Sequence, residues 1–179
     1  NHMKKTNEKY FVKIEPDFLF DTYKQFKSEY TPWIYLYLKL KYNYFITKAP
    51  NKIFEIDRND IGMFYNINAA TISRCFQELK DKGLLIKVKN KYRLLNEVDF
   101  IKSYELTNNI TEKEHIAHIQ VYKNKFNNLT HDIHKNRPSG NTQRMVIKCL
   151  RIFFYLYVKN RHCFNKDTGV VDSAETNNS

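Results

Sequence analysis

The sequence predicts a mainly α-helical fold that carries one small β-hairpin. Only four glycines and four prolines interrupt the 179 residues, and so few breaking residues favour long helices over a fold of many turns. Apolar residues recur at helical spacing along most of the chain, whereas two short segments on either side of residue 90 have strand character. A chain of this length can bury enough surface to fold without a metal ion or a disulfide.

Composition indicates a basic protein, which fits either a polyanionic partner or a generic basic surface. The formal net charge is +11, and lysine and arginine in such excess neutralise phosphates and release counterions. The three cysteines, Cys75, Cys149 and Cys163, show no metal-binding spacing and indicate a reducing cytoplasm. No apolar run reaches the ~18 residues that a membrane span requires, and the polar amino end does not resemble a signal peptide. We therefore expect a cytoplasmic protein with no membrane partner.

The chain divides into four predicted regions. Residues 1–9 include Asn1-His2-Met3, which looks like a tag remnant, and form a flexible start. Residues 10–100 hold the main folded domain, and residues 101–164 form a helical carboxy-terminal region. Residues 165–179 lack aromatic side chains and are predicted to be a disordered tail.

The amino-terminal part predicts a strand followed by two helices. Residues 10–14 alternate in polarity, as a short strand does. Pro16 suits the first turn of a helix that we expect to extend to about Lys27. Thr31 and Pro32 then mark the start of a helix over 33–45, which is apolar almost all round and should be buried.

The middle of the chain contains strong stop and start signals. Asn66 interrupts a helical pattern, Asn68 suits an N-cap, and Gly83 suits a left-handed C′ position. The predicted order is a strand at 53–56, a helix at 57–65, a helix at 69–82, and strands at 84–88 and 92–95 around a basic turn at 89–91.

This order resembles the winged helix-turn-helix superfamily over residues 31–97. The run from Phe64 to Arg74 resembles the turn and recognition helix, and the run from Gln77 to Ile86 resembles the entry into the wing. The resemblance implies a winged helix-turn-helix core with extra N- and C-terminal helices, and double-stranded DNA as the partner. The chain also looks like plasmid replication initiators or conjugation-accessory proteins of low-GC Gram-positive bacteria. A transcription repressor of the same fold fits equally well.

The helix at 69–82 has a polar face that suits the major groove. Small residues at its start let the helix backbone approach the bases, and Glu78 and Asp81 come late, where the helix would leave the groove. Arginine can bind guanine bidentately, and glutamine can bind adenine. The predicted base-reading residues are Ala70, Thr71, Ser73, Arg74 and Gln77.

A second set of residues is predicted to hold the DNA backbone. These residues are basic or amide side chains on the hairpin, at helix starts and in nearby loops, and such contacts set affinity rather than sequence choice. They are Lys52, Arg58, Asn68, Lys80, Lys87, Lys89, Asn90, Lys91 and Arg93.

The carboxy-terminal region predicts two helices joined by a hinge. The first helix covers 112–129 after a Thr111 cap, the hinge covers 135–142, and the second helix covers 142–162. The second helix should either pack on the domain or pair two copies into a homodimer. Its expected inward stripe is Met145, Cys149, Phe153 and Leu156.

Other chemistry is weakly indicated. Two histidine pairs, His115 with His118 and His131 with His134, have a spacing that could share a metal ion. Histidines that face solvent or phosphate are the better interpretation, because no closed ligand set is present. No catalytic or nucleotide-binding motif occurs, so we expect neither an enzyme nor a cofactor. The main alternative to DNA binding is a protein–protein interaction module of a replication or transfer complex.

Overall fold

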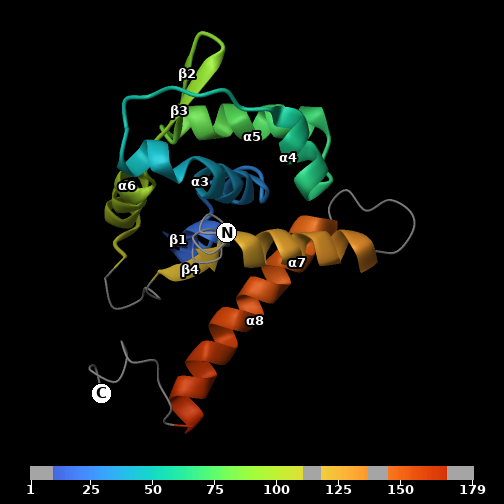
Figure 1. Ribbon diagram of the computed structural model, residues 1–179. Helices are drawn as coiled ribbons and strands as arrows, with labels where there is room; N and C mark the ends of the chain where they lie inside the picture. The colour runs from blue at the N-terminus through green and yellow to red at the C-terminus, as the bar shows by residue number, and fades with distance from the viewer. Residues whose placement is uncertain (1–9, 111–117, 137–144, 169–179) are drawn as a thin grey trace.

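The computed structural model describes residues 10–110, 118–136 and 145–168, which form seven helices and two antiparallel two-stranded sheets (Figure 1). The prediction of a mostly helical fold with a small β component is confirmed. In chain order the elements are β1 (Phe11–Ile14), α2 (Pro16–Leu19), α3 (Thr31–Thr47), α4 (Arg58–Tyr65), α5 (Ala69–Asp81), β2 (Leu85–Val88), β3 (Lys91–Leu94), α6 (Val98–Asn108), β4 (Ile119–Tyr122), α7 (Lys123–Asn136) and α8 (Met145–Thr168).

Helix α3 forms the centre of the molecule. Its residues from Thr31 to Leu36 are fully buried, as the sequence predicts for a helix that is apolar almost all round. Figure 1 shows α5 and the β2–β3 hairpin on one side of α3, and the β1–β4 sheet with α7 on the other. Helix α8 extends away from this body on the side opposite to the hairpin.

The predicted helix at 112–129 is wrong over residues 119–122. These residues form β4, which pairs antiparallel with β1 so that Ile14 lies opposite Ile119 and Phe11 lies opposite Tyr122. The segment alternates buried and exposed positions, and β1 offers backbone groups that would otherwise lack a partner. Helix α7 starts only at Lys123, while Thr111 and residues 112–117 lie outside the described residues.

The helix predicted from Pro16 to Lys27 is also wrong, because α2 ends at Leu19. Asp21 and Lys24 adopt left-handed backbone conformations, which no α-helix accommodates. The Asp21 carboxylate accepts hydrogen bonds from the backbone N–H groups of Gln25 (2.6 Å) and Phe26 (3.1 Å). This side chain therefore replaces the helical carbonyl acceptors and turns the chain toward α3.

The predicted strand at 53–56 is reduced to a single bridge. Phe54 exchanges two backbone hydrogen bonds of 2.8 Å with Tyr92. Its ring stacks on Tyr42, with 4.1 Å between ring centroids, and the Tyr42 hydroxyl donates to the Glu55 carbonyl (3.0 Å). Asp57 then caps α4, so the segment leaves the hairpin before a ladder can form.

The carboxy-terminal half differs from prediction in two further places. Helix α6, which the sequence reasoning missed, starts where the Asn96 side chain accepts from the Val98 N–H (3.0 Å). Helix α8 continues to Thr168, so residues 165–168 belong to a helix rather than to a disordered tail. Of the predicted hinge at 135–142, the first two residues end α7 and the rest lies outside the described residues.

The inward stripe predicted for α8 is wrong, because Phe153 and Leu156 are exposed. Rings on α3 and α7 select a different face: Phe154 lies 5.3 Å from Trp33 and 6.0 Å from Phe126, measured between ring centroids. The buried residues of the helix are Val146, Ile147, Leu150 and Val158.

A buried ionic network joins the amino-terminal strand, α3 and the end of the hairpin. The Lys39 ammonium pairs with the Glu97 carboxylate and donates to the Lys13 carbonyl (2.7 Å). The Tyr35 hydroxyl lies 2.8 Å from the same carboxylate and 2.7 Å from the Leu95 carbonyl. Burial, reinforced by the Glu97 charge, raises the pKa of Tyr35 well above its ordinary value, so the hydroxyl stays neutral.

Breaking this network is expected to destabilise the fold strongly. Glu97→Leu leaves the Lys39 charge buried and unpaired, and we expect the free energy of unfolding to fall by about 3–5 kcal/mol. Urea denaturation followed by circular dichroism measures the change. The double variant Lys39→Met/Glu97→Leu removes both charges and should recover much of the loss. Equal stability of the single and double variants would contradict this account.

Candidate nucleic-acid interface

Helix α5 begins at Ala69, as predicted, and ends at Asp81, one residue before the predicted end. The Asn68 side chain accepts a hydrogen bond from the Thr71 N–H (2.8 Å), which satisfies one free donor of the first turn. Gly83 follows the helix in the left-handed region, with φ of 72°. The stripe of Ile72, Cys75, Phe76 and Leu79 is buried, as predicted. The opposite face therefore points away from the core.

The predicted base-reading residues lie together on this outward face of α5. Ala70, Ser73, Arg74 and Gln77 are exposed, and Thr71 is half-buried. Two local hydrogen bonds order the longer side chains. One joins the Arg74 guanidinium to the Thr71 hydroxyl (3.5 Å), and the other joins the Gln77 amide to the Asp81 carboxylate (2.8 Å).

Arg58 has more protein contacts than the sequence predicts. Its guanidinium lies 4.5 Å from the centroid of the Phe76 ring and donates to the hydroxyls of Ser73 (3.1 Å) and Tyr92 (2.9 Å). One side chain thus links α4, α5 and β3. This arrangement fixes the angle between α5 and the hairpin, and it orients the Ser73 hydroxyl.

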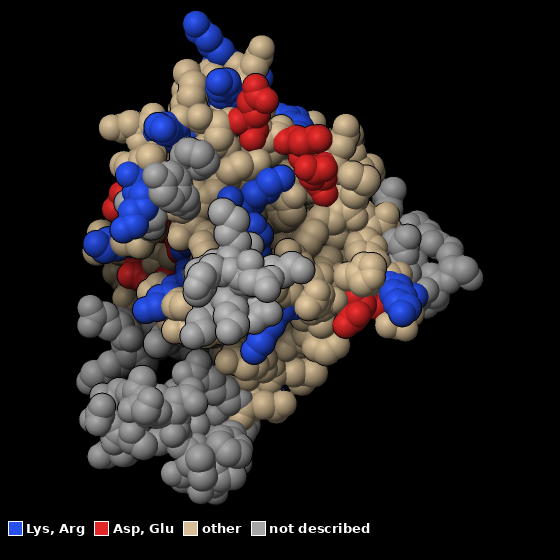
Figure 2. Space-filling view, in the orientation of Figure 1, with Lys and Arg blue, Asp and Glu red and all other residues tan. Residues whose placement is uncertain are grey.

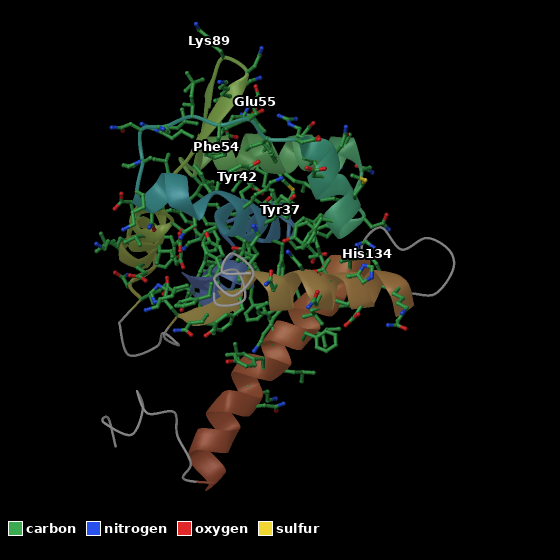
Figure 3. All side chains as sticks on the ribbon, in the orientation of Figure 1. Tyr37, Tyr42, Phe54, Glu55, Lys89 and His134 are labelled. Carbon is green, nitrogen blue, oxygen red and sulfur yellow. The ribbon has the colours of Figure 1, made fainter. Side chains whose placement is uncertain are left out.

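The β2–β3 hairpin presents a basic tip. Lys89 lies at the end of the hairpin, as Figure 3 shows, and adopts a left-handed conformation with φ of 57° in the two-residue turn. Lys87, Asn90 and Lys91 are exposed, and Arg93 is half-buried. Figure 2 shows Lys and Arg side chains along this hairpin at the top of the view, with a group of Asp and Glu side chains beside them.

The remaining predicted backbone contacts are more dispersed. Lys52 is exposed in the segment between α3 and α4, and Lys80 is half-buried in the last turn of α5. Asn68 is exposed at the start of α5, where its side chain also caps the helix. The structure thus groups the hairpin residues with α5. It places Lys52 and Lys80 at the margins of the surface that α5 and the hairpin form.

Glu78 has a structural role at this surface. The sequence predicts it only as one of two acidic residues late in α5, where the helix would leave the groove. Its carboxylate is buried and accepts hydrogen bonds from the backbone N–H groups of Lys27 (2.5 Å) and Ser28 (3.2 Å) and from the Thr31 hydroxyl (2.6 Å). The two N–H groups belong to the segment before α3, and the Thr31 hydroxyl belongs to its first residue. A carboxylate near the N-terminus of a helix also complements the helix dipole. Glu78 therefore anchors α5 to the central helix.

An open hollow of about 1060 Å³ lies between α5 and the segment of residues 27–30. Arg74 and Gln77 line it from α5, and Lys27 and Lys82 add two exposed cations that the sequence reasoning missed. In the sequence, Lys27 is visible only as a lysine shortly before the predicted helix start at Thr31, and nothing local links it to α5. Contacts between distant parts of the chain, from Glu78 to Lys27 and Ser28 and from Cys75 to Ser28, bring it beside the outward face of α5.

The histidines do not assemble a metal site in the part of the chain that the structure describes. His118 and His131 are exposed, while His115 lies outside the described residues. The His134 ring donates from Nε2 to the Phe64 carbonyl (2.6 Å), near the end of α4 (Figure 3). His134 therefore joins α7 to α4.

Comparisons with protein families, with curated proteins and with solved structures gave no match to this chain. None of the described helices is long and apolar enough to cross a membrane.

Glu78→Ala is expected to loosen the contact between α5 and α3. Two backbone donors and one hydroxyl lose their acceptor, so we expect the free energy of unfolding to fall by about 1–3 kcal/mol. Chemical denaturation measures the loss. Asp81→Ala, at an exposed position one turn later, is the matched control and should change stability by less than about 0.5 kcal/mol. Equal effects of the two variants would show that Glu78 is not an anchor.

The thiol of Cys75 should be unreactive in the folded protein. Burial raises its pKa, so less thiolate forms at a given pH, and the side chain is inaccessible. Alkylation by iodoacetamide at pH 8, mapped by mass spectrometry of peptides, should modify the half-buried Cys149 before Cys75. Cys75 should react only in denaturant. Modification of Cys75 at the rate of Cys149 in native buffer would contradict the packing described for α5.

Proposed function

We propose that this protein is a winged helix-turn-helix protein that binds double-stranded DNA in a sequence-specific manner. In this proposal α4 and α5 are the helix-turn-helix, α5 is the recognition helix, and the β2–β3 hairpin is the wing. The observation that carries the proposal is the exposed polar face of α5 next to a lysine-tipped hairpin.

The sizes and charges of the side chains support docking by the first half of α5. Ala70 and Ser73 are small and exposed, so the helix backbone can approach the base edges closely. Arg74 can then bind guanine O6 and N7, and Gln77 can bind adenine. The carboxylates lie away from this docking surface, because Glu78 is buried and Asp81 is the last residue of α5, beyond the half that docks.

Backbone contacts would come from both sides of α5. The wing supplies Lys87, Lys89 and Lys91 on one side, and the segment of residues 27–30 supplies Lys27 on the other. Such contacts position a protein on the duplex and make its affinity depend on salt. Arg58 acts on DNA indirectly in this proposal, because it holds Ser73 and the wing in place.

We propose a role in plasmid replication, in plasmid transfer or in transcription control, without a catalytic step. The chemistry of the described surface supports binding: polar and cationic side chains gather on α5 and the hairpin. A protein-interaction module remains the competing function, and it predicts partner binding that varies little with salt and no retained duplex.

Arg74→Ala is the most informative variant for base reading. DNA selected from a random pool by the purified protein provides the cognate site. On that site we expect the variant to lose about 1–3 kcal/mol of binding free energy, measured by fluorescence anisotropy, and to change little on random duplex. An unchanged affinity for the cognate site would show that α5 does not read bases through Arg74.

Lys89→Ala is the matched control for charge alone. It removes one cation at the tip of the wing, so all duplexes should weaken alike and the slope of log affinity against log salt should fall by about one unit. Lys102→Ala, an exposed cation on α6, should change neither quantity. A sequence-dependent loss in Lys89→Ala would contradict its assignment to the DNA backbone.

A further inference from the structure

Helix α8 carries an exposed apolar surface that nothing in the DNA-binding proposal uses. Ile152, Phe153, Tyr155, Leu156 and Tyr157 are each between 46% and 59% exposed. Residues 152–158 contain no charged side chain, although α8 has exposed lysines before and after this run, at Lys148 and Lys159. An uncharged, aromatic centre with a charged rim is the usual composition of a protein interface.

A groove lies directly beside this surface. It has a volume of about 320 Å³ and is lined mainly by apolar side chains of β4, α7 and α8, among them Ile119, Phe126 and Tyr157, with Gln120 and Lys125 as its polar members. The chain therefore carries protruding rings and an apolar recess on the same surface. A two-fold interface requires this combination, because each copy must present both the protrusion and the recess that receives it.

We propose that this surface binds a second copy of the same chain, through antiparallel contact of the two α8 helices. The size of the exposed apolar area supports a second copy of the chain as the partner. Large apolar side chains bury about 150–250 Å² each, so five half-exposed ones offer about 500 Å² per copy and about 1,000 Å² for a pair. That area reaches the lower bound for a specific protein interface, and it includes Phe153 and Tyr157, which also line the groove.

The apolar surface of α8 is placed so that two copies can pair through it without covering the proposed DNA-binding face of α5. Figure 1 shows α8 leading away from the body on the side opposite to the β2–β3 hairpin. Two copies joined there keep both α5 faces open to solvent. This consequence depends on the proposed function: a two-fold dimer with two open recognition helices binds an inverted repeat, whose half-sites face the same side of the duplex.

Arg151 links the proposed interface to the recognition helix. Its guanidinium pairs with the Glu29 carboxylate (2.7 Å), and Glu29 belongs to the segment of residues 27–30 that Glu78 holds against α5. The positive charge of Arg151 is thereby matched within its own chain. It does not add to the repulsion between two α8 helices.

Sedimentation equilibrium in the absence of DNA tests the pairing separately from the proposed function. The wild-type chain should sediment at twice its 21.6 kDa mass in the micromolar range. Ile152→Lys/Leu156→Lys places four lysines in the interface of a pair, and we expect it to be monomeric. Leu106→Lys is the matched control, because Leu106 on α6 is 81% exposed and lies outside α8, and it should remain dimeric.

The milder variant Leu156→Gln covers the case in which two lysines lower the stability of α8. It should keep the wild-type circular dichroism spectrum and raise the dissociation constant of the dimer at least about tenfold. A monomeric wild-type chain, or a dimer that survives both α8 changes, would overturn the proposal. So would a monomer that sediments with phosphatidylserine vesicles and loses that binding in the lysine variant, because the surface would then be a membrane contact.

Discussion

The structure depends on the need to cover α3 on all sides. A helix whose residues from Thr31 to Leu36 are fully buried must be packed by other elements around its whole circumference. Helix α5 and the hairpin cover one side, and the β1–β4 sheet with α7 and α8 covers the other. Because α5 uses its only apolar stripe for this purpose, its polar face must point outward. The candidate DNA-binding surface is thus a consequence of how the central helix is buried.

Two kinds of contact then fix the orientation of that surface. Glu78 holds α5 to the segment before α3 through two backbone donors and to α3 through the Thr31 hydroxyl, and Arg58 holds α5 to the hairpin through Ser73 and Tyr92. These are polar contacts with defined geometry, and they restrict rotation of the helix more than apolar packing alone does. Under the proposed function, these contacts hold α5 in one orientation relative to the hairpin before DNA binds.

The sequence predicted the elements whose signals are local. Asn68 and Gly83 mark the ends of α5 through side-chain and backbone properties of single residues, and both predictions are confirmed. The missed features depend on residues far apart in the chain. Ile14 pairs with Ile119, Lys27 and Ser28 donate to Glu78, and Trp33 selects the inward face of α8 through Phe154. Helical spacing at 112–129 was misleading because an available strand partner outweighed a weak local preference.

The central claim is that the first half of α5 and the hairpin together form the DNA-binding surface. Amide chemical-shift changes in a ¹⁵N-labelled sample, titrated with the duplex selected by the protein, test it most directly. We predict that the largest changes fall on residues 68–77 and 87–91, with small changes in α6 and α7. Changes concentrated on other elements, or a chain that retains no duplex at low salt, would contradict the claim.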